Sequence, residues 1–292
     1  MNVAQKLERL KQSVTSDLTK TGTKTGTSDR VSDKKKDFYQ HDCPKGVDAY
    51  FINHGDGTGT KVYRNASECL IAWSVQLYLR CLDSRITTKV LSNIYMVHCP
   101  NLAAVDNYRK DYIYRLACRR AGEDEDLAFN WRWNGPEHPQ TQKLQALVEE
   151  HVMDTERIGY YCFDVEVAEG EVLRNSEKQE FEKNKICDEM KMKLIKMFGI
   201  NSHDLCAYHF DMHQGNIMKH KNRWVIIDTG RHLLKGIETY VKYKFKVSGG
   251  DTERVCDLET TRHLHNIWDI ANLANCVPPK AKEEIRHIYR NA

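Results

Sequence analysis

Four polar residues in the second half of the chain have the types and the spacing that phosphoryl transfer requires. His209, Asp211 and Asn216 precede a hydrophobic run that ends at Asp228, with a polar turn at 219–222 between them. We expect these residues on two short strands that the turn joins. A transferring phosphoryl group leaves the protein mainly the tasks of positioning and of neutralising charge. Asp211 would orient the acceptor hydroxyl and take its proton, whereas Asn216 and Asp228 would offer oxygen ligands to Mg²⁺.

The other residues of this stretch have supporting roles. We expect His209 to be a buried strut that hydrogen-bonds the backbone of the site, without proton chemistry. Gly215 and Gly230 would relieve the backbone where the loop turns tightly. A metal hydrolase is an alternative, because His209-x-Asp211-x-His213 would direct two imidazoles to one side of a strand. It needs further ligands from other loops, which no motif identifies. The remaining alternative is a polar hairpin turn without chemistry.

The same loop carries a family resemblance. The run 210–218, Phe-Asp-Met-His-Gln-Gly-Asn-Ile-Met, resembles the catalytic loop of the early serine/threonine protein kinases of short-tailed coliphages. The wider pattern His-x-Asp-x-His-x-Gly-Asn is similar to the aminoglycoside and choline kinase branch of the protein-kinase-like superfamily. The close resemblance covers little more than this loop, and a looser one extends from residue 40 to residue 235.

The resemblance implies a two-lobed, protein-kinase-like α+β fold, with a small antiparallel-sheet N-lobe and a truncated, mostly helical C-lobe. It implies a phage enzyme that uses ATP and Mg²⁺ to phosphorylate serine and threonine side chains of host proteins. The hydroxyl-rich N-terminal tail of the enzyme is a further candidate substrate. The expected catalytic residues are Asp211 and Lys61, and the expected metal ligands are Asn216 and Asp228. The expected partners are ATP and host proteins in the host cytoplasm, with no direct contact to nucleic acid and no membrane.

The residues expected to hold the nucleotide phosphates lie upstream. Lys61 stands in a predicted strand at 60–63, in the context of the lysine that binds the α- and β-phosphates. Glu68 is the only acid of the predicted helix 67–82, so it is the candidate to pair with the Lys61 ammonium. The helix dipole alone also favours an acid in a first turn. We expect Ser67 to cap this helix.

The glycine-rich run 55–59 is interpreted as a hairpin turn and not as a phosphate-binding loop. It joins predicted strands at 47–52 and 60–63, and Lys61 follows it too closely for a phosphate loop. The phosphate-covering turn is therefore expected one strand earlier. There Gly46 is the only glycine, which departs from the G-x-G-x-x-G pattern.

A second group of elements is expected to connect the sheet to the catalytic loop. A buried strand at 160–167 would lead to a hinge, where backbone groups of Asp164 and Val167 would meet the adenine edge. This assignment depends on position along the chain alone. The periodicity of 176–198 predicts a helix that ends at Gly199 and precedes the catalytic loop.

Composition along the chain predicts three parts. Residues 1–36 would be a flexible extension, because they include a low-complexity run of Thr, Gly, Lys and Ser. Residues 37–167 would form the N-lobe and 168–292 the C-lobe. The N-lobe would contain an insertion at about 99–157, rich in Arg, Tyr, Trp and acids. Such mixed charge is typical of a solvated face, and a substrate-docking lid is the alternative.

The composition excludes several functional classes. The 292 residues can bury one substantial or two-lobed core, and a net charge of +3 gives no overall basic bias toward nucleic acid. We find no apolar run long enough for a membrane span and no signal peptide. The 10 cysteines never form a C-x-x-C pair, which favours reduced thiols over zinc ligands or disulfides.

Three other functions stay open from the residues alone. His213 stands where serine/threonine kinases usually carry a lysine, so a kinase of small hydroxyl compounds is an alternative. A pseudokinase that inhibits a host factor by contact is another, because the glycine loop is degenerate and Thr229 replaces the usual Phe. Transfer of AMP to hydroxyl groups is a minor third alternative.

Overall fold

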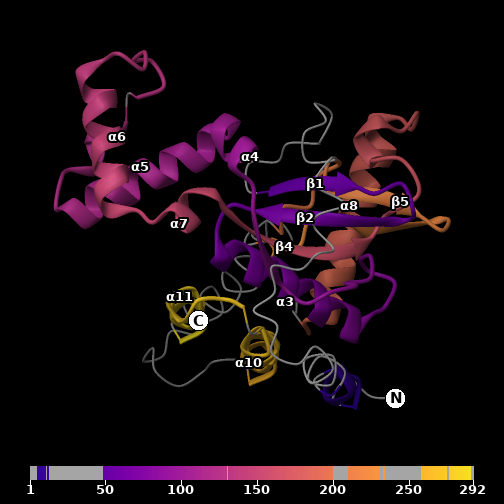
Figure 1. Ribbon diagram of the computed structural model, residues 1–292. Helices are drawn as coiled ribbons and strands as arrows, with labels where there is room; N and C mark the ends of the chain where they lie inside the picture. Colours follow the sequence, from indigo (N-terminus) through magenta and orange to yellow (C-terminus); the bar gives the residue numbers. More distant parts are fainter. Residues whose placement is uncertain are drawn as a thin grey trace, which may run out of the picture.

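The computed structural model describes a mixed α+β chain (Figure 1). The residues that it describes are 5–10, 12, 49–129, 131–199, 210–230, 233, 258–274 and 276–290. They contain a four-stranded antiparallel sheet, a separate two-stranded sheet and several long helices. The expected α+β class is therefore confirmed. No helix in this described part of the chain is long and apolar enough to span a bilayer.

The main sheet places the strand with Lys61 between two others. Its strands are β1 (Ala49–Asn53), β2 (Thr58–Tyr63), β3 (Tyr95–His98) and β4 (Gly159–Glu166), in the spatial order β1-β2-β4-β3. Asn53 pairs with Gly59 across the β1–β2 hairpin. Gly55 and Gly57 in its turn have φ of 77° and 81°, a left-handed backbone that glycine adopts at little cost. The interpretation of this run as a hairpin turn is confirmed.

Helix α3 (Ala66–Leu82) follows β2 directly and is the centre of the main core. Its buried positions surround almost the whole helix, because the sheet covers one side and the helices α10 (Leu258–Asn272) and α11 (Pro279–Arg290) cover another (Figure 1). The predicted cap, Ser67, is wrong by two positions. The side chain of Asn65 accepts the Glu68 backbone N–H at 2.8 Å and caps the helix.

Residues 100–158 form a helical arm between β3 and β4. Its elements are α4 (Pro100–Val105), α5 (Asn107–Ala121), η2 (Glu125–Ala128), α6 (Pro139–His151) and α7 (Asp154–Ile158). Figure 1 shows the arm extending sideways from the sheet. The arm has a small hydrophobic cluster of its own, in which Leu116 and Ala117 of α5 are buried with Leu144 and Val148 of α6.

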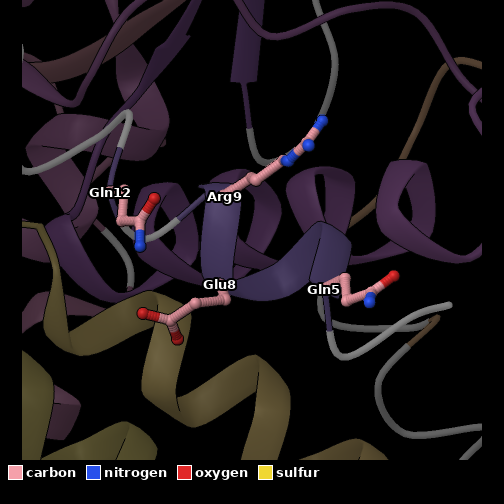
Figure 2. A pocket seen from close by; sticks show the side chains of 4 residues that line it. All are labelled: Gln5, Glu8, Arg9 and Gln12. Carbon is pink, nitrogen blue, oxygen red and sulfur yellow. The ribbon is translucent and has the colours of Figure 1, made fainter. Parts of the chain in front are cut away.

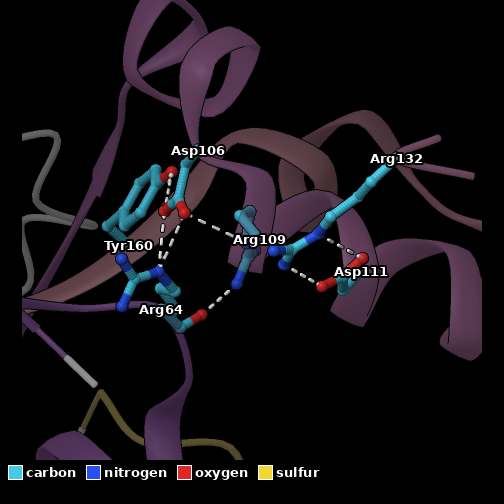
Figure 3. A network of polar contacts seen from close by, with 6 residues as sticks. All are labelled: Arg64, Asp106, Arg109, Asp111, Arg132 and Tyr160. Carbon is cyan, nitrogen blue, oxygen red and sulfur yellow. Dashed lines mark hydrogen bonds and ion pairs between the residues drawn. The ribbon is translucent and has the colours of Figure 1, made fainter. Parts of the chain in front are cut away.

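A buried polar network attaches the helical arm to the corner between β2 and α3 (Figure 3). Both carboxylate oxygens of Asp106 lie 2.9 Å from the Arg64 Nε, and Asp106 also accepts the Tyr160 hydroxyl at 3.1 Å. Arg109 donates to the carbonyl oxygens of Arg64 and Glu156. Since Arg64 comes shortly after Lys61 on the chain, the arm is anchored beside the lysine strand.

The second half of the chain contributes α8 (Glu180–Met197) and the hairpin of β5 (Ile217–His220) and β6 (Arg223–Ile226). The predicted helix at 176–198 is confirmed, although it begins at Glu180. The hairpin turn is tighter than expected. Lys221 and Asn222 alone form it, with φ of 47° and 61°, as a two-residue turn with two left-handed residues requires.

Candidate functional site

A chain of hydrogen bonds connects the predicted lysine to the predicted catalytic loop. Lys61 Nζ donates to the carbonyl oxygen of Ile227 at 2.8 Å. The Ile227 backbone N–H donates to the carbonyl oxygen of Asn216 at 3.0 Å. The Asn216 side-chain amide then donates to the carbonyl oxygen and the carboxylate of Asp211, at 2.9 and 3.1 Å. Residues from β2, the catalytic loop and the strand before Asp228 therefore meet at one place.

Lys61 is the buried cation of this place. Only 9% of the residue is exposed, and burial lowers the pKa of its ammonium to about 8. The negative charge of Asp228 acts in the opposite direction and raises this pKa. The structure thus brings Asp228 into electrostatic range of Lys61, as a shared phosphate and metal site requires.

The partner of the Lys61 ammonium is Gln76 and not the predicted Glu68. Lys61 Nζ donates to Gln76 Oε1 at 2.9 Å. Glu68 lies in the first turn of α3, and the eight residues from 68 to 76 correspond to about 12 Å along a helix axis. The predicted pairing is wrong because it assumed an acidic partner for Lys61. The α3 residue that reaches Lys61 on β2 is Gln76, which carries a neutral amide.

Gln76 also holds the segment that follows Ile227. Its Oε1 accepts the Thr229 hydroxyl at 3.3 Å, and its Nε2 donates to the carbonyl and hydroxyl oxygens of Thr88 at 3.0 and 3.2 Å. The Thr229 hydroxyl also lies 3.0 Å from the carbonyl oxygen of Ala72. The sequence contained one signal for this role, because Gln76 is the only side-chain amide in the apolar run 69–79.

The loop before β5 turns at Asp211 and not at its glycines. Asp211 has a φ of 55°, in the left-handed region that a non-glycine residue occupies at some cost. Gly215 and Gly230 are not among the described glycines with positive φ. A Cβ at Gly215 would lie 2.8 Å from Cε1 of His213, so a larger residue there would require this imidazole to move. The predicted conformational role of the two glycines is therefore wrong.

His213 lies beside the predicted base. Its Nδ1 accepts the Gly215 backbone N–H at 3.0 Å, and its Nε2 lies 3.9 Å from Oδ1 of Asp211. Because Nδ1 acts as an acceptor, the proton of the neutral ring is on Nε2, toward Asp211. The side chain is about half exposed, so a substrate in solution can reach it.

The positions of the remaining predicted residues require two further corrections. Asp211, Asn216 and Asp228 flank the strands β5 and β6 and do not lie on them. His209 and Gly46 lie outside the described residues. The described residues, which leave out His209, contain no group of three or more His, Cys, Asp or Glu that could hold a metal ion.

The backbone groups predicted to meet an adenine edge are used within the protein. The Asp164 N–H donates to Ser92 Oγ, and the Asp164 carbonyl oxygen accepts the Leu91 N–H, both at 2.8 Å. The Val167 N–H donates to the carbonyl oxygen of Gly57 at 2.9 Å. The assignment of the Asp164 backbone and of the Val167 N–H is thus corrected, because neighbouring segments already bond these three groups.

A hollow of about 540 Å³ lies apart from these residues (Figure 2). Gln5, Glu8, Arg9 and Gln12 of the N-terminal helical segment line it. None of the residues predicted to bind nucleotide or metal is among these four, so we assign the hollow no role in the candidate site.

Comparisons with known proteins identified no relative of this chain. No protein-family model, no curated protein and no solved structure matches the chain. The function must therefore be inferred from the residues of the site.

Proposed function

We propose that the chain is an ATP- and Mg²⁺-dependent phosphotransferase that acts on hydroxyl groups, as a serine/threonine protein kinase of the phage type. The observation that carries this proposal is the hydrogen-bonded path from Lys61 through Ile227 and Asn216 to Asp211, with Asp228 next to it. These are the residue types that protein kinases use for the phosphates, the metal and the acceptor hydroxyl.

The order of the elements supports a two-lobed, kinase-like arrangement. In protein kinases a lysine on a sheet strand is followed by a helix that fixes it, and a catalytic loop and an Asp-x-Gly segment come later. Here Lys61 lies on β2, α3 follows and supplies Gln76, and the loop and Asp228 come after α8. The sheet with α3 would then be the N-lobe, and α8 with the β5–β6 hairpin would belong to the C-lobe.

The donor atoms of the site fit a magnesium–nucleotide complex. The Asn216 amide nitrogen is engaged by Asp211, which leaves the Asn216 side-chain oxygen for a cation. Asp228 is exposed, and its Oδ1 accepts the Gly230 N–H at 2.9 Å. An amide oxygen and a carboxylate are ligands that Mg²⁺ prefers. Bound Mg²⁺ would neutralise phosphate charge.

The protein's own groups would then perform the remaining tasks. Lys61 would bind phosphate oxygens through its ammonium, and Asp211 would orient the acceptor hydroxyl and accept its proton. Small hydroxyl compounds are a second candidate class of acceptor. The observation that favours them is His213, which presents an exposed imidazole beside Asp211 where protein kinases carry a lysine.

Intact-mass spectrometry tests the proposal. Purified protein would be incubated with ATP, Mg²⁺ and either a protein lysate or a set of small hydroxyl compounds. We expect a mass increase of one phosphoryl group per modified hydroxyl, which distinguishes phosphoryl from AMP transfer. Asp228→Asn should abolish it, whereas Asp188→Asn, an exposed acid on α8, should not. Full activity in both Asp211→Asn and Asp228→Asn would contradict the proposal.

A further inference from the structure

Gln76 uses its whole side-chain amide in a completely buried position. The oxygen accepts from Lys61 Nζ at 2.9 Å and from the Thr229 hydroxyl at 3.3 Å. The nitrogen donates to two oxygens of Thr88. The relative exposure of Gln76 is 0%, so water does not compete for these bonds.

We propose that Gln76 is a positioning residue that holds Lys61 and the 228–230 segment in one fixed arrangement before any nucleotide binds. One consequence of this proposal rests on the proposed function, namely that a preassembled site binds ATP more tightly. The positioning itself is a property of the free protein. It can therefore be tested whether or not the chain transfers phosphate.

A neutral amide suits this position because it must accept and donate at once. A glutamate could accept from Lys61 and Thr229, but a carboxylate has no proton to donate to Thr88. An apolar residue could do neither. Gln76 thus joins α3, β2 and the segment after β6 through one side chain.

The helix that carries Gln76 is itself held in place. The Thr229 hydroxyl shares its one proton between the Ala72 carbonyl oxygen and Gln76 Oε1. The Tyr78 hydroxyl lies 2.5 Å from Nδ1 of His263 on α10. Asn266 of α10 donates to the same hydroxyl at 3.2 Å. Moving α3 away from Lys61 would break these bonds and open the main core. The lysine is therefore expected to stay in place without a signal that repositions the helix.

The arrangement leaves Lys61 ready for a ligand. An ammonium group has three donors, and Gln76 and Ile227 take two of them. One N–H is left for a phosphate oxygen. Loss of Gln76 would free the side chain to adopt other rotamers, and a ligand would then have to order it again.

Acylation of lysine in the free protein tests the positioning directly. The protein would be treated with an amine-reactive acylating reagent, and the rate of modification of Lys61 would be followed by peptide mass spectrometry. We expect Gln76→Leu to raise this rate about tenfold, since a hydrogen bond to a charged group is lost. Ser74→Ala is the matched control, because Ser74 is equally buried on α3 and bonds only the Ile71 carbonyl oxygen. It should leave the rate unchanged.

Two further variants keep the test decisive if Gln76→Leu does not fold. Gln76→Glu keeps an acceptor for Lys61 but loses the donors to Thr88, so it should protect Lys61 better than Gln76→Leu does and less well than the wild type. Thr229→Val removes the bonds that tie the 228–230 segment to α3, and should raise the rate roughly threefold. Circular dichroism would establish that each variant is folded. Unchanged Lys61 protection in folded Gln76→Leu and in Thr229→Val would overturn the proposal, as would a Gln76→Glu rate equal to that of Gln76→Leu.

Calorimetric titration with ATP and Mg²⁺ then tests the consequence. We expect the dissociation constant to rise about tenfold in Gln76→Leu, to rise less in Gln76→Glu, and to stay near the wild-type value in Ser74→Ala. If the wild type binds no ATP while acylation follows the expected pattern, the positioning role stands and the proposed function falls. If the wild type transfers phosphate but the Lys61 acylation rate is the same in Gln76→Leu as in the wild type, the proposed function stands and the positioning role is wrong.

Discussion

The Nζ atom of Lys61 lies 2.8 Å from the carbonyl oxygen of Ile227, although the two residues are 166 positions apart in the sequence. Because Ile227 directly precedes Asp228, this bond fixes the lysine relative to the carboxylate that we propose as a metal ligand. Under the proposed function, a backbone carbonyl and the amide of Gln76 would hold the lysine as a lysine–glutamate ion pair does in protein kinases.

The buried lysine should make folding stability depend on alkaline pH. Burial lowers the Lys61 pKa from 10.5 to about 8 in the folded protein, whereas the unfolded chain keeps the ordinary value. Between these two values the unfolded state binds more protons, so the free energy of unfolding should rise with pH. The gain would reach about 3 kcal/mol. Below pH 8 the lysine is charged in both states and this contribution is constant.

Urea unfolding on both sides of pH 8 would measure this effect against Lys61→Met. The stability of the wild type should rise relative to that of the variant as the pH increases above the folded pKa. Parallel pH profiles for the two proteins would show that Lys61 is not desolvated as the structure indicates.

Replacement of the predicted base should separate activity from stability. Asp211→Asn should lower phosphoryl transfer by a factor of about 100 or more, because no group is left to accept the hydroxyl proton. Its melting temperature should barely change, since Asn also tolerates the φ of 55°. Asp211→Ala should lose activity and also lose about 1 kcal/mol of stability, because Ala is strained there. Equal melting temperatures for Asn and Ala would argue against the left-handed backbone.

The network at the base of the helical arm should be a large contributor to stability. Asp106→Ala would leave the buried Arg64 guanidinium without its carboxylate, which we expect to cost about 3–5 kcal/mol. Glu125→Ala removes an exposed ion pair with Arg119, and should cost much less because solvent screens this pair. Chemical denaturation of both variants would compare them. Similar losses of unfolding free energy in the two variants would mean that burial does not strengthen the Arg64–Asp106 pair.

Acid should weaken the link between α3 and α8. Burial tends to raise the Asp83 pKa, but hydrogen bonds from Lys193 and from the Arg85 backbone outweigh it and lower the pKa from 3.8 to about 2. A lowered pKa stabilises the fold above pH 3.8, and this contribution, which solvent screening keeps small, is lost as the pH falls toward 2. Lys193→Met should flatten the acid part of the stability curve. An unchanged curve would mean that the 2.8 Å contact between Lys193 and Asp83 has no effect.

The elements that depend on local pattern could be predicted from the sequence. The glycine-rich run 55–59, between two predicted strands and directly before Lys61, indicated a hairpin turn, and the periodic apolar residues of α8 indicated a helix. Each of these signals acts over a few neighbouring residues. Their positions were therefore right to within a few residues, even though Asn65 and not Ser67 caps α3.

Two of the errors at the site concern groups whose partner is distant in the sequence. Glu68 was chosen for its charge, but the register of β2 against α3 places Gln76 opposite Lys61. The backbone of Asp164 was assigned to a ligand, but Ser92 and Leu91 occupy both of its hydrogen-bonding groups. Only the packed fold decides which oxygen atom meets which proton.

The sequence by itself determined the candidate residue types and their order, because Asp211, Asn216 and Asp228 flank one hairpin whose geometry is local. The tertiary structure alone decided how Lys61 joins them. That contact requires β2, α3 and the end of β6 to pack against one another, and the buried amide of Gln76 is satisfied only when all three are in place.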